Sequence, residues 1–284
     1  MLQLINLPSW LFTVLVAFTT SSISVIGLLL MRKYLPKFYV VSEDNAFANI
    51  ALRQISTVLA VVLAFAVITI WNNYELQREH TGTEASLLGN MYRDSRGLRP
   101  DVEKEVQKLI TIYTSDLVTD GWPSMAEGRE SRVAWLSFNK LYGKVIRFMP
   151  ENPREEIVYT KMIDNLNELA KFRRLRQIRN ANPLIPQILW ITIYSGTVLI
   201  LISGYFLRTS KVRMQITLTA INGLMLGLIF SMMLLLNYPY RGSLQISSYP
   251  LENLLKDVFP MAEVTTHTPQ PDTLNADSNN RSMN

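Results

Sequence analysis

The chain has 284 residues, of which 48% are hydrophobic and only 18% charged, with a net charge of +5. Soluble domains carry roughly 25% charged residues, and here the charges are nearly absent from four long windows, which is typical of an integral membrane protein. The basic residues lie mostly beside those windows, where they anchor helix ends, so the positive charge predicts no nucleic-acid partner.

The first charge-free window, residues 10–31, ends at Arg32 and Lys33. At about 1.5 Å per residue it spans roughly 33 Å, enough to cross the hydrocarbon core of a bilayer. Because residues 1–9 carry no charge and the apolar run is long, we expect a retained membrane helix and not a cleaved signal peptide. The second window, residues 54–71, is shorter and rich in small and β-branched residues, which lipid-embedded helices tolerate.

The third and fourth windows, residues 184–207 and 214–236, are separated by only the six residues 208–213. They must therefore form a tight antiparallel hairpin. Gly223 and Gly227 lie four residues apart in the fourth window, a spacing that favours close packing of membrane helices. Together the four windows predict an all-α integral membrane protein with four transmembrane helices.

Helical periodicity dominates the stretch between the second and third windows, residues 72–183. It predicts a continuation of the second membrane helix to Leu98, followed by three further helices over residues 101–117, about 125–148 and 154–179. Gly121-Trp122-Pro123 is expected to end the first of these helices and separate it from the second. The apolar side of the last helix is predicted to consist of Ile157, Ile163, Leu166 and Leu169. Such amphipathic helices need partners for their apolar faces, so we expect a helical extramembrane domain.

The sequence thus divides into five parts. They are a first transmembrane hairpin (1–71), a helical domain (72–183), a second hairpin (184–236), a post-membrane segment (237–264) and a polar tail expected to be disordered (265–284). The post-membrane segment contains a short amphipathic stretch, Leu251 to Phe259.

Catalytic and metal-binding chemistry is sparse. The chain has no cysteine and only two distant histidines, His80 and His267. The sequence therefore predicts no metal site, no cofactor and no catalytic residues, and hence no enzyme. Glu75 and Glu79 share one helix face and could bind a cation or relay a proton, but a solvated face is the commoner reason for such a pair. No ionisable residue lies inside the four windows, which argues against a proton-driven pump.

Orientation is not fixed by the basic residues that flank the membrane windows. One side of the membrane would hold seven: Arg32, Lys33, Lys37, Arg53, Arg208, Lys211 and Arg213. The other side would also hold seven: Arg78, Lys171, Arg173, Arg174, Arg176, Arg179 and Arg241. The count is a tie, so the sequence leaves the orientation open.

Two junction motifs carry a resemblance to a known family. Trp71-Asn72-Asn73-Tyr74-Glu75 ends the second window, after an Ala64-Phe65 step, and Asn237-Tyr238-Pro239-Tyr240-Arg241-Gly242 follows the fourth. They are similar to the Trp-Asn-x-Tyr-Glu exit of the second membrane helix and the Asn-Pro-Phe-Gly segment of the bestrophin anion channels. The helix order agrees as well. Three shorter steps resemble those of the bacterial bestrophin-like membrane proteins: Asn45-Ala46, Glu84-Ala85 and Trp122-Pro123. The resemblance covers about residues 40–260.

This resemblance implies a location and a set of partners. Bestrophins are pentameric anion channels with the insert and both termini in the cytosol. The chain is therefore expected to be a multi-pass protein of the cell membrane, the inner membrane in a bacterium, with a cytosolic insert. Its expected partners are the lipid bilayer, further copies of itself in a homo-oligomer of five subunits, and anions.

The resemblance also implies a pore neck on the second helix, where the matching stripe is Thr57, Val61 and Phe65. The alternative that these three side chains simply pack against helices or lipid stays open. Gly242 is followed by no carboxylate until Glu252, so no calcium clasp is expected. The leading hypothesis is an oligomeric anion channel, and the alternative is a non-conducting membrane scaffold or sensor whose insert binds a partner protein.

Overall fold

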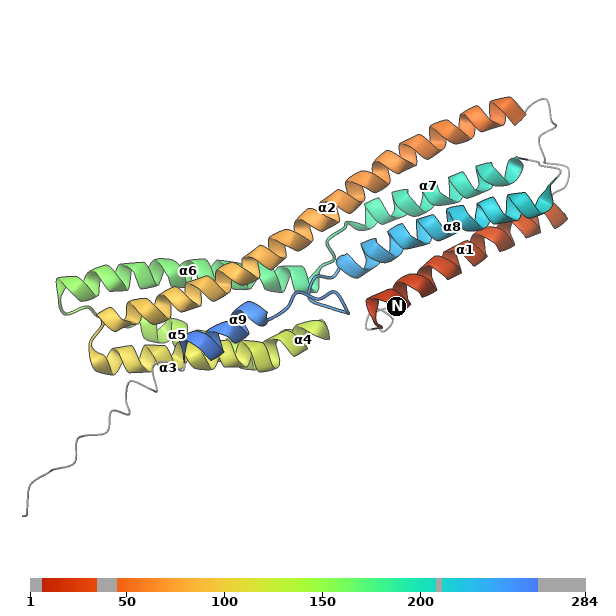
Figure 1. The fold of residues 1–284 in the computed structure, drawn as a ribbon. Coiled ribbons are helices and arrows are strands. Elements are labelled where there is room, and N and C mark those ends of the chain that lie inside the picture. Colours follow the sequence, from red (N-terminus) through yellow and green to blue (C-terminus); the bar gives the residue numbers. More distant parts are fainter. Residues whose placement is uncertain (1–6, 35–44, 208–210, 260–284) are drawn as a thin grey trace, which may run out of the picture.

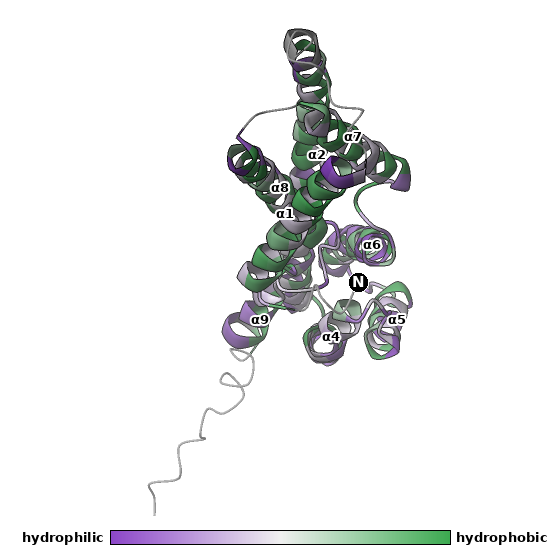
Figure 2. Ribbon diagram, turned by 90° about the vertical axis from the view of Figure 1, so that its right-hand side faces the viewer, coloured by the Kyte–Doolittle hydropathy of each residue, from purple (hydrophilic) through white to green (hydrophobic). Residues whose placement is uncertain are grey.

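The computed structural model describes residues 7–34, 45–207 and 211–259, and all regular secondary structure in these ranges is helical. Four helices are long and apolar enough to cross a membrane: α1 (Ser9–Tyr34), α2 (Asn45–Asp94), α7 (Gln187–Phe206) and α8 (Val212–Leu236). They form one end of an elongated molecule, and the insert forms the other (Figure 1). The hydrophobic residues gather on these four helices (Figure 2). The predicted all-α fold with four membrane helices is confirmed.

Helix α2 belongs to both ends of the molecule. It is one continuous helix of 50 residues, about 75 Å long at 1.5 Å per residue. Its first half lies beside α7 and α8, and its second half lies among the helices of the insert (Figure 1). The predicted continuation beyond Tyr74 is therefore confirmed, and a short 3-10 turn, Ser95–Gly97, ends it. Helix α2 runs unbroken across residue 71, so no break in the helix marks the predicted boundary between the first hairpin and the helical domain. That boundary stays a prediction.

Helices α1 and α8 approach each other closely at the two glycines of α8. A Cβ atom on Gly227 would lie 2.5 Å from the Cα atom of Ala17, and one on Gly223 would lie 2.7 Å from the Cα atom of Ser21. The Ser21 hydroxyl donates a hydrogen bond of 2.9 Å to the carbonyl of Ala220. Only glycine permits this backbone approach, so the close packing predicted from the Gly-xxx-Gly spacing is confirmed.

Helix α7 begins three residues later than predicted. Pro186 disfavours helical geometry at the preceding residue, so Leu184 and Ile185 stay outside the helix. Their backbone N–H groups donate to Asn237 instead, to its carbonyl at 3.0 Å and to its side-chain Oδ1 at 3.0 Å. The entry to α7 is thereby tied to the residue that ends α8.

The insert packs its helices around the second half of α2. These are α3 (Pro100–Asp116), a π-helical turn (Leu117–Gly121), α4 (Trp122–Ala126), α5 (Arg132–Ile146) and α6 (Pro153–Ala181). The post-membrane segment adds α9 (Tyr249–Asn253) and a π-helical turn (Leu254–Val258). One apolar core joins all of them, and Leu88, Ile110, Leu141, Leu166 and Leu251 are completely buried in it.

The predicted break at Gly121-Trp122-Pro123 is wrong. The π-helical turn carries α3 into α4, closed by a hydrogen bond from the Trp122 N–H to the Leu117 carbonyl. Pro123 sits in the first turn of α4, where its missing N–H does no harm. The chain turns instead at Gly128, whose φ of 79° lies in the left-handed region that glycine tolerates. The next helix, expected from about residue 125, therefore starts at Arg132.

The apolar side of α6 was only partly predicted. Leu166 and Leu169 are completely buried and Ile163 packs against the same core, but Ile157 is 63% exposed. Glu155 takes the buried position on that turn instead. The prediction for Ile157 is wrong because, at about 100° per residue, Ile157 lies roughly 160° around α6 from Glu155, and this buried carboxylate has a cation to pair with.

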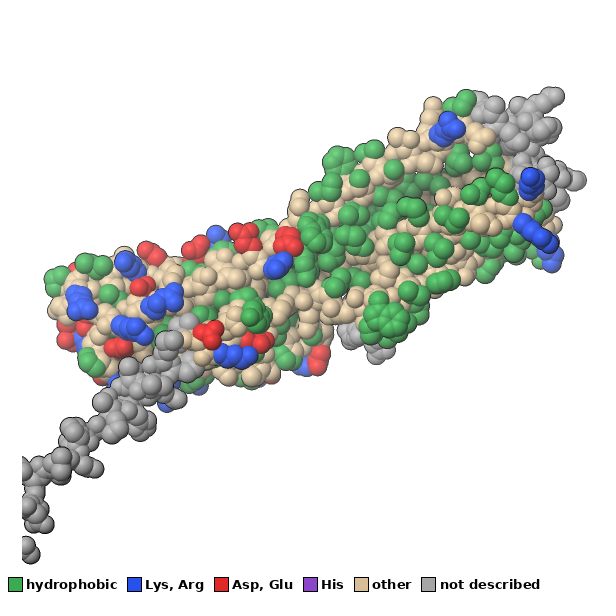
Figure 3. Space-filling model, in the orientation of Figure 1, with side chains coloured by type: hydrophobic (Ala, Val, Ile, Leu, Met, Phe, Trp, Pro, Cys, Tyr) green, Lys and Arg blue, Asp and Glu red, His purple; other side chains and the backbone are tan. Residues whose placement is uncertain are grey.

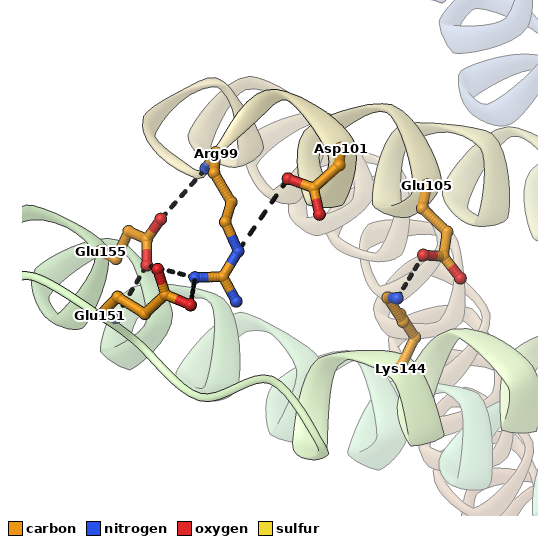
Figure 4. A network of polar contacts seen from close by, with 6 residues as sticks. All are labelled: Arg99, Asp101, Glu105, Lys144, Glu151 and Glu155. Carbon is orange, nitrogen blue, oxygen red and sulfur yellow. Dashed lines mark hydrogen bonds and ion pairs between the residues drawn. The ribbon is translucent and has the colours of Figure 1, made fainter.

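That cation is Arg99, at the far end of the insert (Figure 4). The Arg99 backbone N–H donates to Glu155 Oε1 at 3.2 Å, and its guanidinium contacts Glu155 at 3.4 Å and Glu151 at 2.7 Å. Nearby, Lys144 of α5 pairs with Glu105 of α3. These contacts join the start of α3 to the start of α6 and close the end of the bundle. The tail at 265–284 lies outside the described residues, as do 260–264.

Candidate functional site

The predicted neck residues lie on one outward face of α2. Val61 is 51% exposed and Phe65 67%, and Thr57 is exposed too, with its hydroxyl bonded to the Arg53 carbonyl of its own helix at 2.9 Å. Leu59 and Leu63 of the same helix are buried against the membrane core. The outward stripe is therefore covered only by lipid or by another copy of the chain, and its role as a neck stays a prediction.

The outward face changes character where α2 leaves the membrane helices. At the same side of the helix follow Ile68, Asn72, Glu75 and Glu79, at spacings of three or four residues. All of these except the partly buried Glu75 are exposed. Glu75 forms a surface ion pair with Arg78 at 3.6 Å, a pair that contributes little to stability. The surface likewise passes from apolar to charged side chains along the molecule (Figure 3).

The junction motifs are only partly brought together. The Tyr74 hydroxyl donates to the Leu244 carbonyl at 2.9 Å, which fixes α2 to the segment after α8. Within that segment the Ile246 N–H donates to the Pro239 carbonyl at 2.8 Å, and Gly242 turns the chain with a φ of 78°. Trp71 and Asn72 are exposed and take no part in this contact.

Tyr240 reaches a different motif of the insert. It is buried with its ring edge against Trp122, the centroids 6.2 Å apart. The Trp122 indole N–H donates to the Ile246 carbonyl at 2.8 Å. The Trp122-Pro123 step of the insert and the segment Pro239-Tyr240-Arg241-Gly242 after α8 therefore form one structural unit.

A buried ion pair completes this unit. Glu84 of α2 is 1% exposed and Arg176 of α6 is 4% exposed. The Arg176 Nε donates to both carboxylate oxygens of Glu84, at 3.2 and 3.1 Å. The guanidinium also lies 5.1 Å from the Trp122 ring centroid, a cation–π contact. We call Glu84, Trp122, Arg176 and Tyr240 the junction cluster, because four separate segments of the chain meet there.

The electrostatics of the junction cluster are those of a desolvated pair. Burial raises the pKa of the Glu84 carboxyl, and the charge and hydrogen bonds of Arg176 oppose that shift. Burial, with Glu84 nearby, raises the pKa of Tyr113 to about 12. Such a pair holds α2, α4, α6 and the post-membrane segment in one arrangement, and removing either partner would leave a buried charge without its counter-ion.

The sequence-based prediction missed Arg176, which was counted among the basic residues that flank the membrane. A signal was nonetheless available. Leu169, Arg173, Arg176 and Asn180 follow one another at spacings of three and four, and so extend the buried stripe of α6. An arginine in that register requires a buried acid. Across the residues that the structure describes, no three His, Cys, Asp or Glu side chains are grouped to hold a metal ion.

Comparisons with known proteins agree with this geometry. The family model of the Bestrophin-like domain matches residues 18–251. Crystal structures of two point mutants of a bacterial bestrophin homologue from Klebsiella pneumoniae are similar, each with a TM-score of 0.62 and 13% identity over 89% of this chain and 98% of that chain. A third mutant has a TM-score of 0.57 and 16% identity, covering 92% and 100%.

At such low identity the structural likeness establishes the fold alone, and no curated protein matches the chain. The family model, in contrast, spans most of the 284 residues. Its match includes all four membrane helices in whole or in part, the insert and the segment that carries Tyr240. The chain is therefore a multi-pass membrane protein that belongs to the bestrophin-like family.

Proposed function

We propose that the chain is the subunit of an oligomeric ion channel in which Thr57, Val61 and Phe65 of several copies surround an apolar neck. The observation that carries this proposal is the outward stripe on α2, with Val61 51% and Phe65 67% exposed while the opposite face is packed. Copies that turned this stripe toward a common axis would form an uncharged constriction, and such a constriction can gate by losing its water.

Membership of the family supports anions as the permeant ions. The carboxylates of Glu75 and Glu79 lie past the neck on the same side of α2. In a ring of copies they would oppose anion entry, because rings of acidic side chains favour cations. Selectivity then depends on the balance between the apolar neck and these carboxylates.

The proposal includes a location and an assembly. We place the protein in the cell membrane, the inner membrane of a bacterium, with the insert and both termini in the cytosol. The assembly is a homo-oligomer, with five subunits as the family expectation. The outward apolar stripe on each α2 supports a ring, because every copy presents the same face to the axis.

Planar bilayers and native mass spectrometry test this function together. Purified wild-type protein should form a homo-oligomer and carry a current in a salt gradient, with a reversal potential on the anion side. A protein that stays monomeric in several mild detergents and carries no current would overturn the proposal. A homo-oligomer with a cation-side reversal potential would retain the channel and reject the anion.

A second candidate is a non-conducting scaffold or sensor. One observation favours it: Val133, Trp135 and Leu136, near the start of α5, are each nearly half exposed. An apolar surface on the insert can bind a partner protein. This candidate predicts no current and a stoichiometric partner that copurifies with the full-length chain and is lost from Trp135→Ala.

A further inference from the structure

A cavity of about 300 Å³ lies between α2 and the segment that follows α8. Tyr74, Arg78 and Thr81 form its α2 wall, at spacings of four and three residues that place them on one side of the helix. Residues from 245 to 250 form the opposite wall. The size of the cavity is near the lower end for small-molecule sites. We call this cavity the side pocket.

The two walls of the side pocket are held together by hydrogen bonds. The Tyr74 hydroxyl donates to the Leu244 carbonyl at 2.9 Å, which fixes the segment after α8 against α2. The Ile246 N–H donates to the Pro239 carbonyl at 2.8 Å, and the Ile246 carbonyl accepts the Trp122 indole N–H at 2.8 Å. The pocket is therefore preformed, and a ligand does not have to order its walls on binding.

The charge of the side pocket comes from Arg78. Among the described residues that line the pocket, Arg78 is the one cation and none is acidic. Its guanidinium contacts Glu75 at 3.6 Å, with the two side chains 69% and 40% exposed. A surface pair of this kind is weak, and a guanidinium has five N–H donors. Arg78 therefore keeps donors for a second carboxylate, one supplied by a ligand.

Two neutral side chains add hydrogen-bond donors to the pocket. The Ser247 hydroxyl oxygen accepts the Tyr249 N–H at 3.1 Å, and its own proton has no acceptor among the residues that the structure describes. The side-chain amide of Gln245, also in the wall, is exposed and has no hydrogen bond within the same part of the chain. A guanidinium with neutral donors beside it suits a ligand that carries anionic oxygens.

The rest of the lining is aromatic or apolar. It consists of the rings of Tyr74 and Tyr249 and the side chains of Ile246 and Pro250. Tyr249 is 61% exposed, so one face of its ring is open to a ligand. Aromatic side chains pack well against another flat ring. The pocket thus combines one cationic end with walls that suit a flat apolar body.

We propose that the side pocket binds a small aromatic carboxylate. The carboxylate lies against Arg78 and the Ser247 hydroxyl, and the ring of the ligand packs against Tyr74 and Tyr249. A bound ligand would therefore bridge α2 and the segment after α8. The inference goes beyond ion conduction and holds whether or not the protein conducts.

Ligand-detected NMR of the full-length protein in nanodiscs tests the charge requirement, with benzoate and its neutral analogue benzamide as the two probes. Wild-type protein should bind benzoate about tenfold more tightly than benzamide, because hydrogen bonds between two charged groups are the stronger ones. Arg78→Gln should remove this preference by weakening benzoate alone. Arg93→Gln, at an exposed position of α2 outside the pocket, is the matched control and should bind benzoate as the wild type does.

A second pair of variants tests the location. Ser247→Trp should fill the pocket and abolish benzoate binding, whereas Ser243→Trp, at an exposed position of the same segment outside the pocket, should not. Thermal unfolding checks that both proteins fold. The proposal is overturned by a wild type that binds no benzoate or binds both probes equally, or by an unchanged benzoate affinity in Arg78→Gln. A folded Ser247→Trp protein that still binds benzoate would also overturn it, because the probe would then lie elsewhere on the protein or in the lipid.

Discussion

The two halves of α2 belong to one helix but differ in the kinds of side chain that they expose and bury. In the membrane half, Val61 and Phe65 are exposed while Leu59 and Leu63 are buried, and both faces are apolar. In the insert half, the outward face is polar and the buried face includes Glu84. An exposed apolar side chain in the membrane half is therefore covered either by lipid or by another copy of the chain, whereas a buried charge in the insert identifies a specific partner within the chain.

The largest loss of stability is expected when the buried ion pair between Glu84 and Arg176, in the insert half, is broken. Glu84→Gln leaves the Arg176 guanidinium buried without its counter-ion, and should lower the free energy of unfolding by about 3–5 kcal/mol. Thermal unfolding in detergent measures this loss. Glu168→Gln, at an exposed position of α6, is the control and should change little. If the contact is structural alone, the double variant Glu84→Leu/Arg176→Met should recover most of the lost stability.

A smaller effect is expected in the membrane half of the molecule. Gly227→Ala places a Cβ atom 2.5 Å from the Cα atom of Ala17, so α1 and α8 must separate. The free energy of unfolding should fall by about 1–3 kcal/mol, as for other overpacked sites. Gly204→Ala adds the same methyl group to open space and should change stability by less than about 1 kcal/mol. Equal losses in the two variants would contradict the assigned α1–α8 contact.

The outward face of α2 provides a test of selectivity without a large change in stability. Neutralising the two carboxylates of this face, in Glu75→Gln/Glu79→Gln, should raise the ratio of anion to cation permeability by roughly threefold. Reversal potentials in a salt gradient report this ratio. Glu103→Gln, on the insert and far from α2's outward face, should leave it unchanged. A ratio that does not move would mean that these carboxylates do not face the conduction path.

The smallest expected effect is a pH dependence at the boundary of the two halves. Burial lowers the pKa of His80, with Lys171 and Arg179 of α6 adding to the shift and Glu79 opposing it, and the ring packs 4.9 Å from Phe172. Because the folded-state pKa lies below the ordinary 6.5, the stability that the neutral ring provides is present above that pH and is lost as the pH falls below it.

His80→Gln should remove this dependence. The melting temperature of the wild type should then fall more steeply than that of the variant between pH 7 and pH 5, in thermal unfolding at constant salt. Parallel curves for the two proteins would contradict the assigned environment of His80.

The sequence was sufficient for features that depend on period and composition. Four charge-free windows predicted the membrane helices, and Gly223 and Gly227 predicted a close helix contact. It was insufficient where tertiary partners override local preference. Pro123 lies in the first turn of α4 after a π-helical turn, and Ile157 is exposed because the buried stripe of α6 runs through Glu155 and Leu166 on another side of the helix. Arg176 was missed because it belongs to a run of basic residues beside a membrane helix, and such runs usually serve to anchor the helix end at the membrane surface.

The neck proposed for α2 can be tested by modifying single cysteines, because the native chain has none. Thiol reagents of the methanethiosulfonate class would be added to channels that carry a cysteine at Thr57, Val61 or Phe65, or at Val198, which is 52% exposed on α7. The account predicts that the reagent blocks current through the three α2 variants and leaves the Val198→Cys channel unaffected. Block at Val198 with none at Val61 and Phe65 would contradict it.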